Sequence, residues 1–214
     1  TSGIYHNAQA TSTTSQLFLR NNIIVNESTP GSTSGITVAI RRSGANLGNY
    51  NTASNNNALY AGIASAKNLL YYDGTNSSQT LAQMQGIASF SPRENVSLET
   101  LPNFINSTTT PYDLHLVSNL NCAVSGAAAP IATFTYDYEN DSRDPSTPDI
   151  GADEFTGSGA GAGVWRGVDN VWTNINNWCG EVPKIYTNVT IPNAAPNYPL
   201  ITTATPVCNN ITIN

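Results

Sequence analysis

Apolar residues in this chain occur in short runs rich in Ile, Leu, Val, Tyr and Thr, and Asn, Gly, Ser or Pro borders each run. Such runs are typical of β-strands, because β-branched and aromatic side chains pack well on a pleated surface. The best helix candidate, Leu81–Ile87, is short and poorly capped. The pattern predicts an all-β protein with strands at Leu17–Arg20, Ile23–Val25, Ile36–Ile40, Ala58–Tyr60, Asn68–Tyr72, Leu114–Val117, Thr133–Tyr136, Asn188–Ile191 and Ile211–Ile213.

The spacing of the first strands indicates how the chain turns between them. Leu17–Arg20 and Ile23–Val25 are separated only by Asn21 and Asn22. A tight hairpin favours Asn-Gly with two positive φ angles, whereas Asn-Asn suits a corner with one Asn in the left-handed region. A long polar loop, Asn26–Gly35, precedes the next strand, and phrases such as NNIIV, KNLLYY and NNITI recur loosely. This order predicts a β-solenoid, with a long-looped β-sandwich as the alternative.

The composition changes after Phe155. The stretch TGSGAGAG contains only small residues and Thr, and it is typical of a flexible linker. All three tryptophans of the chain fall within fourteen residues beyond it: Trp165, Trp172 and Trp178. We therefore expect three parts: a solenoid domain over 1–155, a linker over 156–163 and a small Trp-rich β-module over 164–214.

The tryptophans of this module have two interpretations. Exposed indoles at Trp165, Trp172 and Trp178 could stack on sugar rings of a carbohydrate ligand. Alternatively, they form the core, because small domains need large aromatic burial or a disulfide and each Trp buries on the order of 150–250 Å². We expect the core arrangement.

The three cysteines bear on the redox environment. Cys179 and Cys208 bracket the Trp-rich module, which predicts a disulfide between them in an oxidising compartment. Cys122 is then left over, and free thiols are the alternative. A zinc site is not expected, since the chain has no Cys-x-x-Cys and His6 and His115 lie far away in sequence.

Charge and hydropathy exclude two classes of partner. Charged residues make up 10% of the chain, against roughly 25% in an ordinary globular domain, and the net charge is −6 with a pI near 4.6. Nucleic-acid binding needs a clustered basic face, which the eight Lys and Arg do not form along the sequence. No apolar stretch approaches the ~20 residues that cross a bilayer. Because the chain starts at Thr1, we expect a fragment or a processed product.

The stretch from Asp137 to Phe155 is the most acidic of the chain. Oxygen ligands at the alternate positions Asp137, Glu139 and Asp141 could hold a calcium ion, but the Gly and Glu that complete an EF-hand loop are missing. The alternative is a solvated end loop in which Arg143 pairs with a carboxylate such as Asp149. We expect no bound cofactor.

No catalytic group is predicted. Glycoside hydrolysis needs two carboxylates on one groove, and the acidic residues of the expected solenoid body stand apart in the sequence: Glu27, Asp73, Glu94, Glu99 and Asp113. Arg41 and Arg42 have no carboxylate nearby in sequence, and His115 is expected to face solvent or to stack in the wall. Motifs of serine hydrolases, phosphate-binding loops and zinc proteases are absent from the sequence.

Two parts of the chain resemble known families, and the first is the expected solenoid. The order YDLHL, SGAAAPI and a closing PDIGADEF resembles the last coil of right-handed parallel β-helices, the pectate-lyase-like repeat proteins secreted by Bacteroidetes, over roughly residues 17–155. NNIIVN (Asn21–Asn26) resembles a family coil with an inward Asn. The resemblance implies that a capping coil contains Arg143, Asp149, Ile150, Gly151, Ala152 and Glu154.

The second resemblance concerns the Trp-rich module. Its pattern W…W…NW-C-G-x-V-P…NVTIP…YP-x-I…C-NN-x-TI is similar to a small β-module repeated in surface proteins exported by type IX secretion. The matching residues are Trp165, Trp172, Asn177, Trp178, Cys179, Gly180, Val182, Pro183, Ile191, Pro192, Tyr198, Pro199, Cys208 and Ile211. In such relatives the closing NNITI usually leads into further β-coils.

Together these features imply a structural or adhesive segment of a large secreted cell-surface protein, acting as a stiff stalk or adhesin. Its expected partners are polysaccharides or surface glycoproteins of a host, prey or matrix, neighbouring domains of the same chain, or further copies in a fibre. A carbohydrate-binding module and a remnant polysaccharide lyase or hydrolase are the alternatives.

Overall fold

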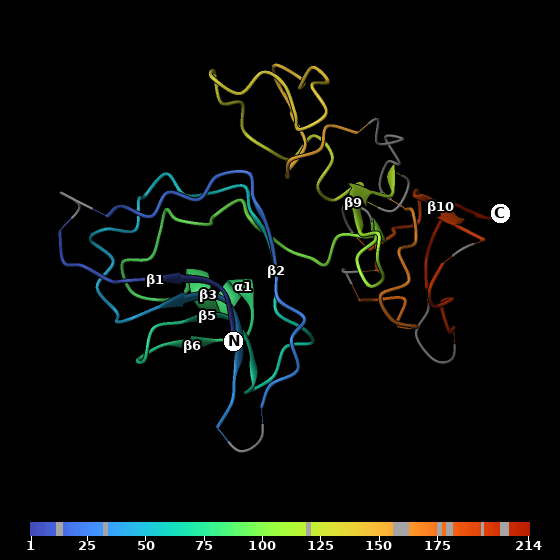
Figure 1. The fold of residues 1–214 in the computed structure, drawn as a ribbon. Helices are drawn as coiled ribbons and strands as arrows, with labels where there is room; N and C mark the ends of the chain where they lie inside the picture. The colour runs from blue at the N-terminus through green and yellow to red at the C-terminus, as the bar shows by residue number, and fades with distance from the viewer. Residues whose placement is uncertain are drawn as a thin grey trace. The chain divides into compact units, whose positions relative to one another are not determined.

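The computed structural model describes most of the chain, and its elements are nearly all strands (Figure 1). The described residues are 1–11, 15–31, 34–118, 121–155, 163–174, 177–178, 182–193, 195–201 and 206–214. The elements are β1 Ser2–His6, β2 Ile23–Val25, β3 Thr37–Arg42, β4 Ala58–Tyr60, β5 Asn68–Tyr72, β6 Ser77–Ser78, α1 Leu81–Gln85, β7 Leu98–Glu99, β8 Phe104–Asn106, β9 Asp113–Leu116, β10 Asn188–Ile191 and β11 Asn210–Ile213. The predicted all-β class is confirmed.

The chain divides into two compact units. Unit 1 comprises Thr1–Pro102 and Gly126–Glu154, and unit 2 comprises Asn103–Ser125 and Phe155–Asn214. The division near residue 155 resembles the expected one, but the segment Asn103–Ser125 groups with the C-terminal part of the chain. Among the described residues, no helix has the length and hydropathy of a membrane span.

Unit 1 is built on two parallel ladders. In one, β3 pairs in parallel with both β1 and β5, so that Ile4, Ile40 and Tyr71 share one register, and β6 adds to β5 in antiparallel orientation. In the other, β4 lies between β2 and β7, again with parallel pairing. Each pass of the chain therefore contributes one strand to each ladder: β1 and β2, then β3 and β4, then β5 and β7.

The corners between the ladders follow the Asn-Asn prediction. Asn21 has φ 58° and Asn56 has φ 56°, the left-handed conformation that Asn tolerates better than most residues. The side-chain oxygen of Asn57 accepts the backbone N–H of Asn22 at 2.9 Å, and the backbone N–H of Asn57 donates to the Ser97 hydroxyl at 2.9 Å. A polar side chain of one pass thus accepts the backbone N–H at the corner of the neighbouring pass.

The inward Asn implied by the family resemblance has a counterpart in Asn26. This residue is buried, and its amide donates to the Val38 carbonyl at 2.9 Å.

A continuous apolar core fills unit 1. Ile24, Ile40, Leu59 and Tyr71 come from different strands and are buried together. The segment around α1 adds Met84 and Phe90, and the Phe90 ring meets the Tyr50 and Tyr71 rings edge-on at 5.8 and 5.4 Å between centroids. Thr80 caps the single-turn helix by accepting the N–H of Gln83, so this helix is held by its cap and by buried Met84.

The observed strands partly match the predicted ones. The predictions at 23–25, 58–60, 68–72 and 188–191 agree to the residue. Leu17–Arg20 is not a strand, because only isolated parallel bridges form there, from Leu17 to Tyr50 and from Arg20 to Asn55. Thr133–Tyr136 is reduced to one bridge, between Tyr136 and Ser142. The sequence pattern missed β1, β6, β7 and β8.

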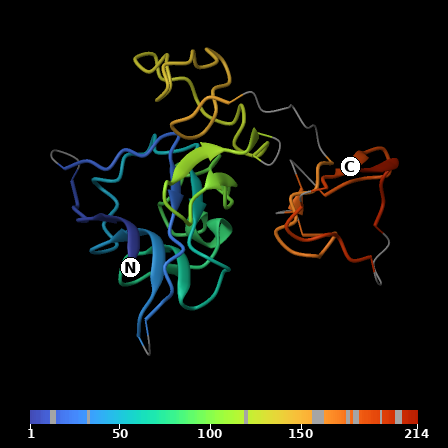
Figure 2. The ribbon, with the colours of Figure 1, turned by 45° about the vertical axis from the view of Figure 1, so that its right-hand side comes forward.

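Unit 2 contains an antiparallel pair and a parallel pair of strands. β8 and β9 form the antiparallel pair, while β10 and β11 pair in parallel, with Val189 opposite Ile211 and Ile191 opposite Ile213 (Figure 2). Val189 and Ile191 are buried, whereas all of β11 is exposed.

Candidate functional site

The segment 126–154 contains the acidic stretch and packs on a corner of unit 1. The backbone N–H of Gly151 donates to the Asn21 carbonyl at 3.0 Å, and a Cβ at Gly151 would lie 2.8 Å from Cδ1 of Ile23. Gly151 also has φ 119°, which disfavours any side chain there. Ile150 beside it is fully buried. This packing explains Ile150 and Gly151 within the PDIGADEF stretch.

Arg143 holds this segment together from within. Its guanidinium donates to the carbonyls of Asp149 and Gly151 and lies 3.4 Å from the Glu154 carboxylate. The expected pairing of Arg143 with a nearby carboxylate is confirmed, but the partner is Glu154 and not the suggested Asp149, whose carboxylate accepts the backbone N–H of Gly126. The side chains of Arg143 and Glu154 are both mostly buried. Their ion pair and the hydrogen bonds of Arg143 therefore stabilise the loop.

The structure groups different acids from those predicted for calcium. Asp137, Glu139 and Asp153 each bring one oxygen within 4.8 Å of the others, and Asp141 does not belong to this group. The backbone of Asp141 is used locally, since its N–H donates to the Asp137 carboxylate at 2.8 Å. Burial acts to raise the pKa of Asp137, but backbone N–H donors including that of Glu154 outweigh it and lower the pKa.

We expect millimolar calcium to leave the melting temperature of the protein unchanged. Calcium takes about six to eight oxygen ligands, and this group supplies three carboxylates, of which Asp137 already accepts backbone N–H groups of Asp141 and Glu154. Differential scanning calorimetry with calcium, and again with a chelator, measures this. A melting temperature that rises with calcium and falls back with chelator would contradict the expectation.

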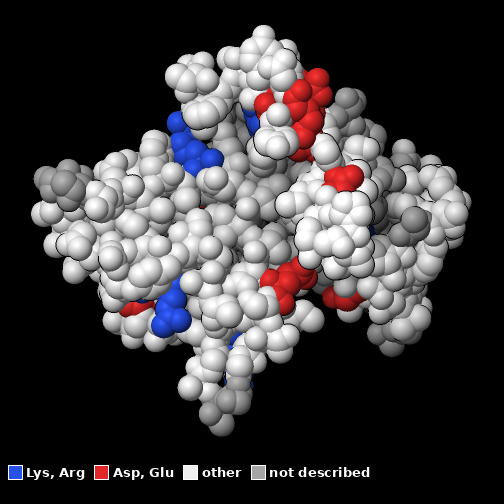
Figure 3. Space-filling model, viewed as in Figure 1, with Lys and Arg blue, Asp and Glu red and all other residues white. Residues whose placement is uncertain are grey.

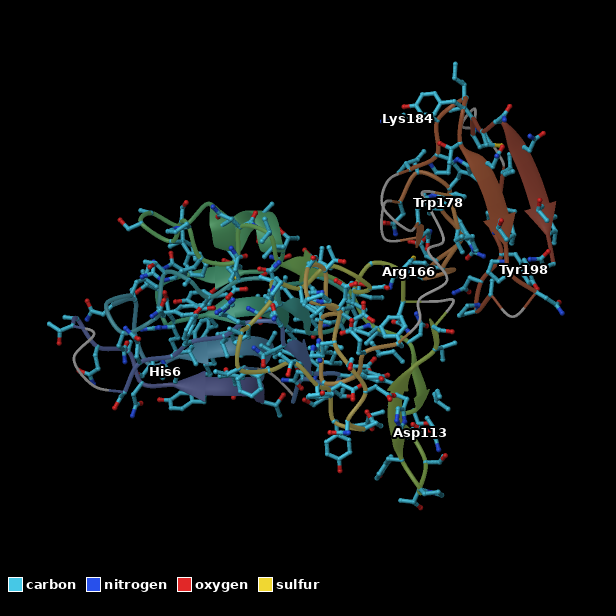
Figure 4. All side chains as sticks on the ribbon, turned by 90° about the horizontal axis from the view of Figure 1, so that it is seen from above. His6, Asp113, Arg166, Trp178, Lys184 and Tyr198 are labelled. Atoms are coloured by element: carbon cyan, nitrogen blue, oxygen red, sulfur yellow. The ribbon has the colours of Figure 1, made fainter. Side chains whose placement is uncertain are left out.

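The three tryptophans form one buried cluster in unit 2, and Figure 4 labels Trp178 among them. Trp165, Trp172 and Trp178 are exposed by 0%, 4% and 2%, and the Trp178 ring lies 4.9 and 4.6 Å from the other two. The indole N–H of Trp178 donates to the Trp172 carbonyl at 2.6 Å, and that of Trp165 donates to the Asn197 carbonyl. The expected core is confirmed, and stacking of these indoles on a ligand is wrong because no indole face is exposed.

The predicted Cys179–Cys208 disulfide is wrong. Cys208 carries a free thiol and packs, partly buried, as a small apolar side chain against the Trp core. Cys179 lies outside the described residues. Cys122, which the prediction left unpaired, is disulfide-bonded, and its segment belongs to the same unit as the Trp core.

Thiol titration of the unreduced protein under denaturing conditions should label Cys208 and leave Cys122 unlabelled. The disulfide withdraws Cys122 from the reaction, whereas the free thiol becomes accessible on unfolding. Peptide mapping after alkylation identifies the labelled cysteine. A chain that is labelled at Cys122 without prior reduction would contradict this assignment.

A buried polar cluster in unit 1 was not predicted from the sequence. Glu94 is fully buried, and its carboxylate accepts hydrogen bonds from the Tyr50 hydroxyl at 2.7 Å, the Asn57 amide at 2.8 Å and the Ser97 hydroxyl at 2.5 Å. Burial, followed by the nearby Glu94 charge, raises the pKa of Tyr50 well above its ordinary value. The phenol therefore stays protonated and donates to the carboxylate.

Two arginines belong to the same cluster. Their guanidinium carbons lie over the Tyr50 ring, Arg42 at 5.3 Å and Arg93 at 5.7 Å from the centroid. Arg93 donates to four backbone carbonyls, including that of Tyr50 at 2.6 Å, and Arg42 donates to the Asn49 side chain at 2.9 Å. These contacts are made in the interior, so the cluster fastens successive passes of the chain together.

The free energy of unfolding should fall as the pH rises above about 10. Burial raises the pKa of both Tyr50 and Tyr71, while an unfolded tyrosine ionises near its reference value of about 10. Below the pKa of the unfolded tyrosines, the neutral phenols make their full contribution to the free energy of unfolding. This contribution is lost as the pH rises from the pKa of the unfolded tyrosines through the pKa values of the folded ones. Urea unfolding across this range measures the loss, and Tyr71→Phe should reduce it. A flat profile would contradict the burial of these phenols.

Asp113 and His115 form an exposed pair that was not predicted. They lie two residues apart on β9, where Figure 4 labels Asp113. The ring Nδ1 of His115 is 2.5 Å from the Asp113 carboxylate. Hydrogen bonds from His115 lower the pKa of Asp113. Their two-residue spacing, which places side chains on one strand face, was the available signal. Of the two positions expected for His115, the solvent-facing one is confirmed.

Comparison with protein-family models, with curated proteins and with solved structures found no match.

Proposed function

We propose that this chain is a structural and adhesive segment of a large secreted bacterial surface protein. In this proposal the three passes of unit 1 are coils of a right-handed parallel β-helix that forms a stiff extracellular stalk. The observation that carries the proposal is the parallel register of β1, β3 and β5, which is repeated in β2, β4 and β7. Stacked coils satisfy backbone hydrogen bonds along the long axis, and a rod results.

The side chains of unit 1 support this role. The Asn corners repeat from pass to pass, and the Glu94 cluster joins residues of successive passes in the interior. Such contacts between neighbouring coils stabilise a stack. They also place the buried Glu94 carboxylate away from any substrate, so we propose no catalytic role for it.

The disulfide of Cys122 supports the extracellular location, because structural disulfides persist in oxidising compartments. The low content of charged residues, 10%, leaves a surface of neutral hydrogen-bonding groups such as Asn, Ser and Thr. Binding through such a surface would be weak at each contact, and repeated copies would multiply it.

Mechanical unfolding tests the stalk. Pulling single molecules by their termini should release unit 1 in successive steps, each on the order of 100 Å for a coil of about 30 residues at about 3.4 Å per residue. Loss of all three passes in one rupture would refute the coil stack and favour a sandwich.

The adhesive part needs a second measurement. Beads coated with the folded protein should adhere to glycoprotein- or polysaccharide-coated surfaces under flow, and heat-unfolded protein on equal beads is the control. The same preparation should release no product from pectins or alginates. Release of sugar fragments would place the chain among polysaccharide-degrading enzymes instead.

A further inference from the structure

Three side chains form a row across the first ladder of unit 1. β1, β3 and β5 lie side by side (Figure 1), and their registers place Tyr5 opposite Arg41 and Arg41 opposite Tyr72. Tyr5 is 59% exposed, and Arg41 and Tyr72 are partly exposed. The preceding residues of β3 and β5, Ile40 and Tyr71, are fully buried. Because successive side chains of a strand point to opposite faces, the row projects away from the core. We call it the Tyr–Arg–Tyr row.

Arg41 is held in this row without a partner for its N–H groups. Its guanidinium carbon lies 5.2 Å from the centroid of the Tyr72 ring, a cation–π contact that fixes the side chain. Within the part of the chain that the structure describes, the Arg41 guanidinium has no hydrogen-bond or ion-pair partner. Asp73 is buried, and its carboxylate accepts the backbone N–H groups of Thr75 and Asn76 at 2.9 and 2.6 Å. The Arg41 charge is therefore available to a ligand.

The row lines an open depression of about 240 Å³. Apart from the two tyrosines, its described lining residues are polar or glycine, and Ser43 is one of them. The Ser43 hydroxyl oxygen accepts the backbone N–H of Ala8 at 2.9 Å, and its own proton has no acceptor among the described residues. The depression thus presents a cation, a free hydroxyl donor and an exposed aromatic ring.

The rest of the surface adds little attraction for anions. The chain has a net charge of −6, and on the face drawn in Figure 3 the Lys and Arg side chains appear only as small separate groups. A polyanion is therefore not drawn to a broad basic patch. Any anion bound at the row must depend on Arg41 itself.

These features select an amphipathic anion as the ligand. A neutral ligand would leave the Arg41 guanidinium without an acceptor, and a compact inorganic anion would make no use of the tyrosine rings. The polar lining also offers no apolar hollow for a large aliphatic side chain. A sugar ring that carries an acidic group meets all three conditions.

We propose that the Tyr–Arg–Tyr row binds an acidic sugar unit of a glycan. The Arg41 fork donates to the carboxylate or sulfate of the sugar, as guanidinium groups do to planar and tetrahedral oxyanions. The C–H face of the ring lies on the electron-rich face of Tyr5, and Ser43 donates to a sugar hydroxyl. The inference names a ligand class for the adhesive role, and in that respect it rests on the proposed function.

Titration calorimetry of the full chain with oligosaccharides tests the binding. Hyaluronan hexasaccharide supplies carboxylates, a carrageenan hexasaccharide supplies sulfate esters, and the hexamer of N-acetylglucosamine is the neutral control. We expect at least one acidic probe to bind and the neutral hexamer not to bind. The acidic probe that binds more tightly identifies the anionic group that the row prefers.

Substitutions assign the binding to the row. Arg41→Gln should weaken it about tenfold, whereas Lys67→Gln, which removes the same charge from an exposed residue of unit 1, should leave it unchanged. Tyr5→Ala should weaken it about fivefold. Tyr72→Ala should also weaken it, but Tyr72→Phe should not, because a phenyl ring still supports the Arg41 cation.

Three results would overturn the inference. They are an absence of binding by both acidic probes, equal effects of Arg41→Gln and Lys67→Gln, and equally tight binding of a peptide of alternating Glu and Gly. A circular-dichroism melt confirms that each variant is folded. If coated beads adhere under flow while the titration is negative, this inference fails and the proposed function stands, so the two failures are distinguishable.

Discussion

Replacing Glu94 with alanine should destabilise unit 1 by about 3–5 kcal/mol, the usual cost of removing one partner from a buried charged network. The substitution leaves the Tyr50 hydroxyl, the Asn57 amide and the Ser97 hydroxyl without their common acceptor. Each unsatisfied buried donor costs about 1–3 kcal/mol. Glu94 has φ 54°, but alanine also has a Cβ, so the backbone cost is similar before and after the substitution.

Urea unfolding followed by far-ultraviolet circular dichroism measures this change. The matched control is Glu27→Ala, because Glu27 is exposed and should change the free energy of unfolding by less than about 0.5 kcal/mol. Glu94→Gln should fall between the two, since its amide keeps one acceptor oxygen and the side-chain volume. If Glu94→Ala lowered the free energy of unfolding no more than Glu27→Ala does, the Glu94 carboxylate would not be the shared hydrogen-bond acceptor that the structure shows.

Local features of unit 1 were predictable from the sequence. The Asn21 corner followed from the preference of Asn for the left-handed region, and β2, β4 and β5 followed from their β-branched and aromatic composition. These features depend on a few neighbouring residues, so a window of the sequence contains the necessary information.

The Glu94 cluster depends on distant residues and was missed for that reason. Tyr50 and Asn57 lie 44 and 37 positions before Glu94, and only the stacking of successive passes brings them together. In the sequence, Glu94 stands as an isolated acid in a polar segment. The register between passes decides its partners, and the irregular loop lengths hide that register.

The cysteines illustrate the same limit in unit 2. Cys179 and Cys208 bracket the Trp-rich module in sequence, which made their pairing a reasonable expectation. The segment Asn103–Ser125 nevertheless belongs to this unit, and Cys122 within it is the disulfide-bonded residue. Proximity along the chain is a poor guide where a distant segment returns to the same unit.

Replacing Trp178 with alanine should unfold the Trp core of unit 2. Truncation of a buried tryptophan costs about 3–5 kcal/mol, which is comparable to the whole stability of a small core. Trp178 contacts both other indoles edge-on and donates its N–H to the Trp172 carbonyl. Besides the three indoles, the cluster of buried apolar residues around Trp178 contains only Val189, Ile191 and Ala195 among the residues that the structure describes.

Intrinsic tryptophan fluorescence isolates this effect, because Trp165, Trp172 and Trp178 are the only tryptophans of the chain. In the Trp178→Ala variant the remaining emission should shift to the wavelength of solvated indole, and the unfolding transition seen by fluorescence should be lost. Val168→Ala is the control, since Val168 is half exposed. Trp178→Phe should retain part of the transition, because phenylalanine refills some of the volume. Emission that stays at a buried wavelength in Trp178→Ala would mean that the core does not depend on this ring.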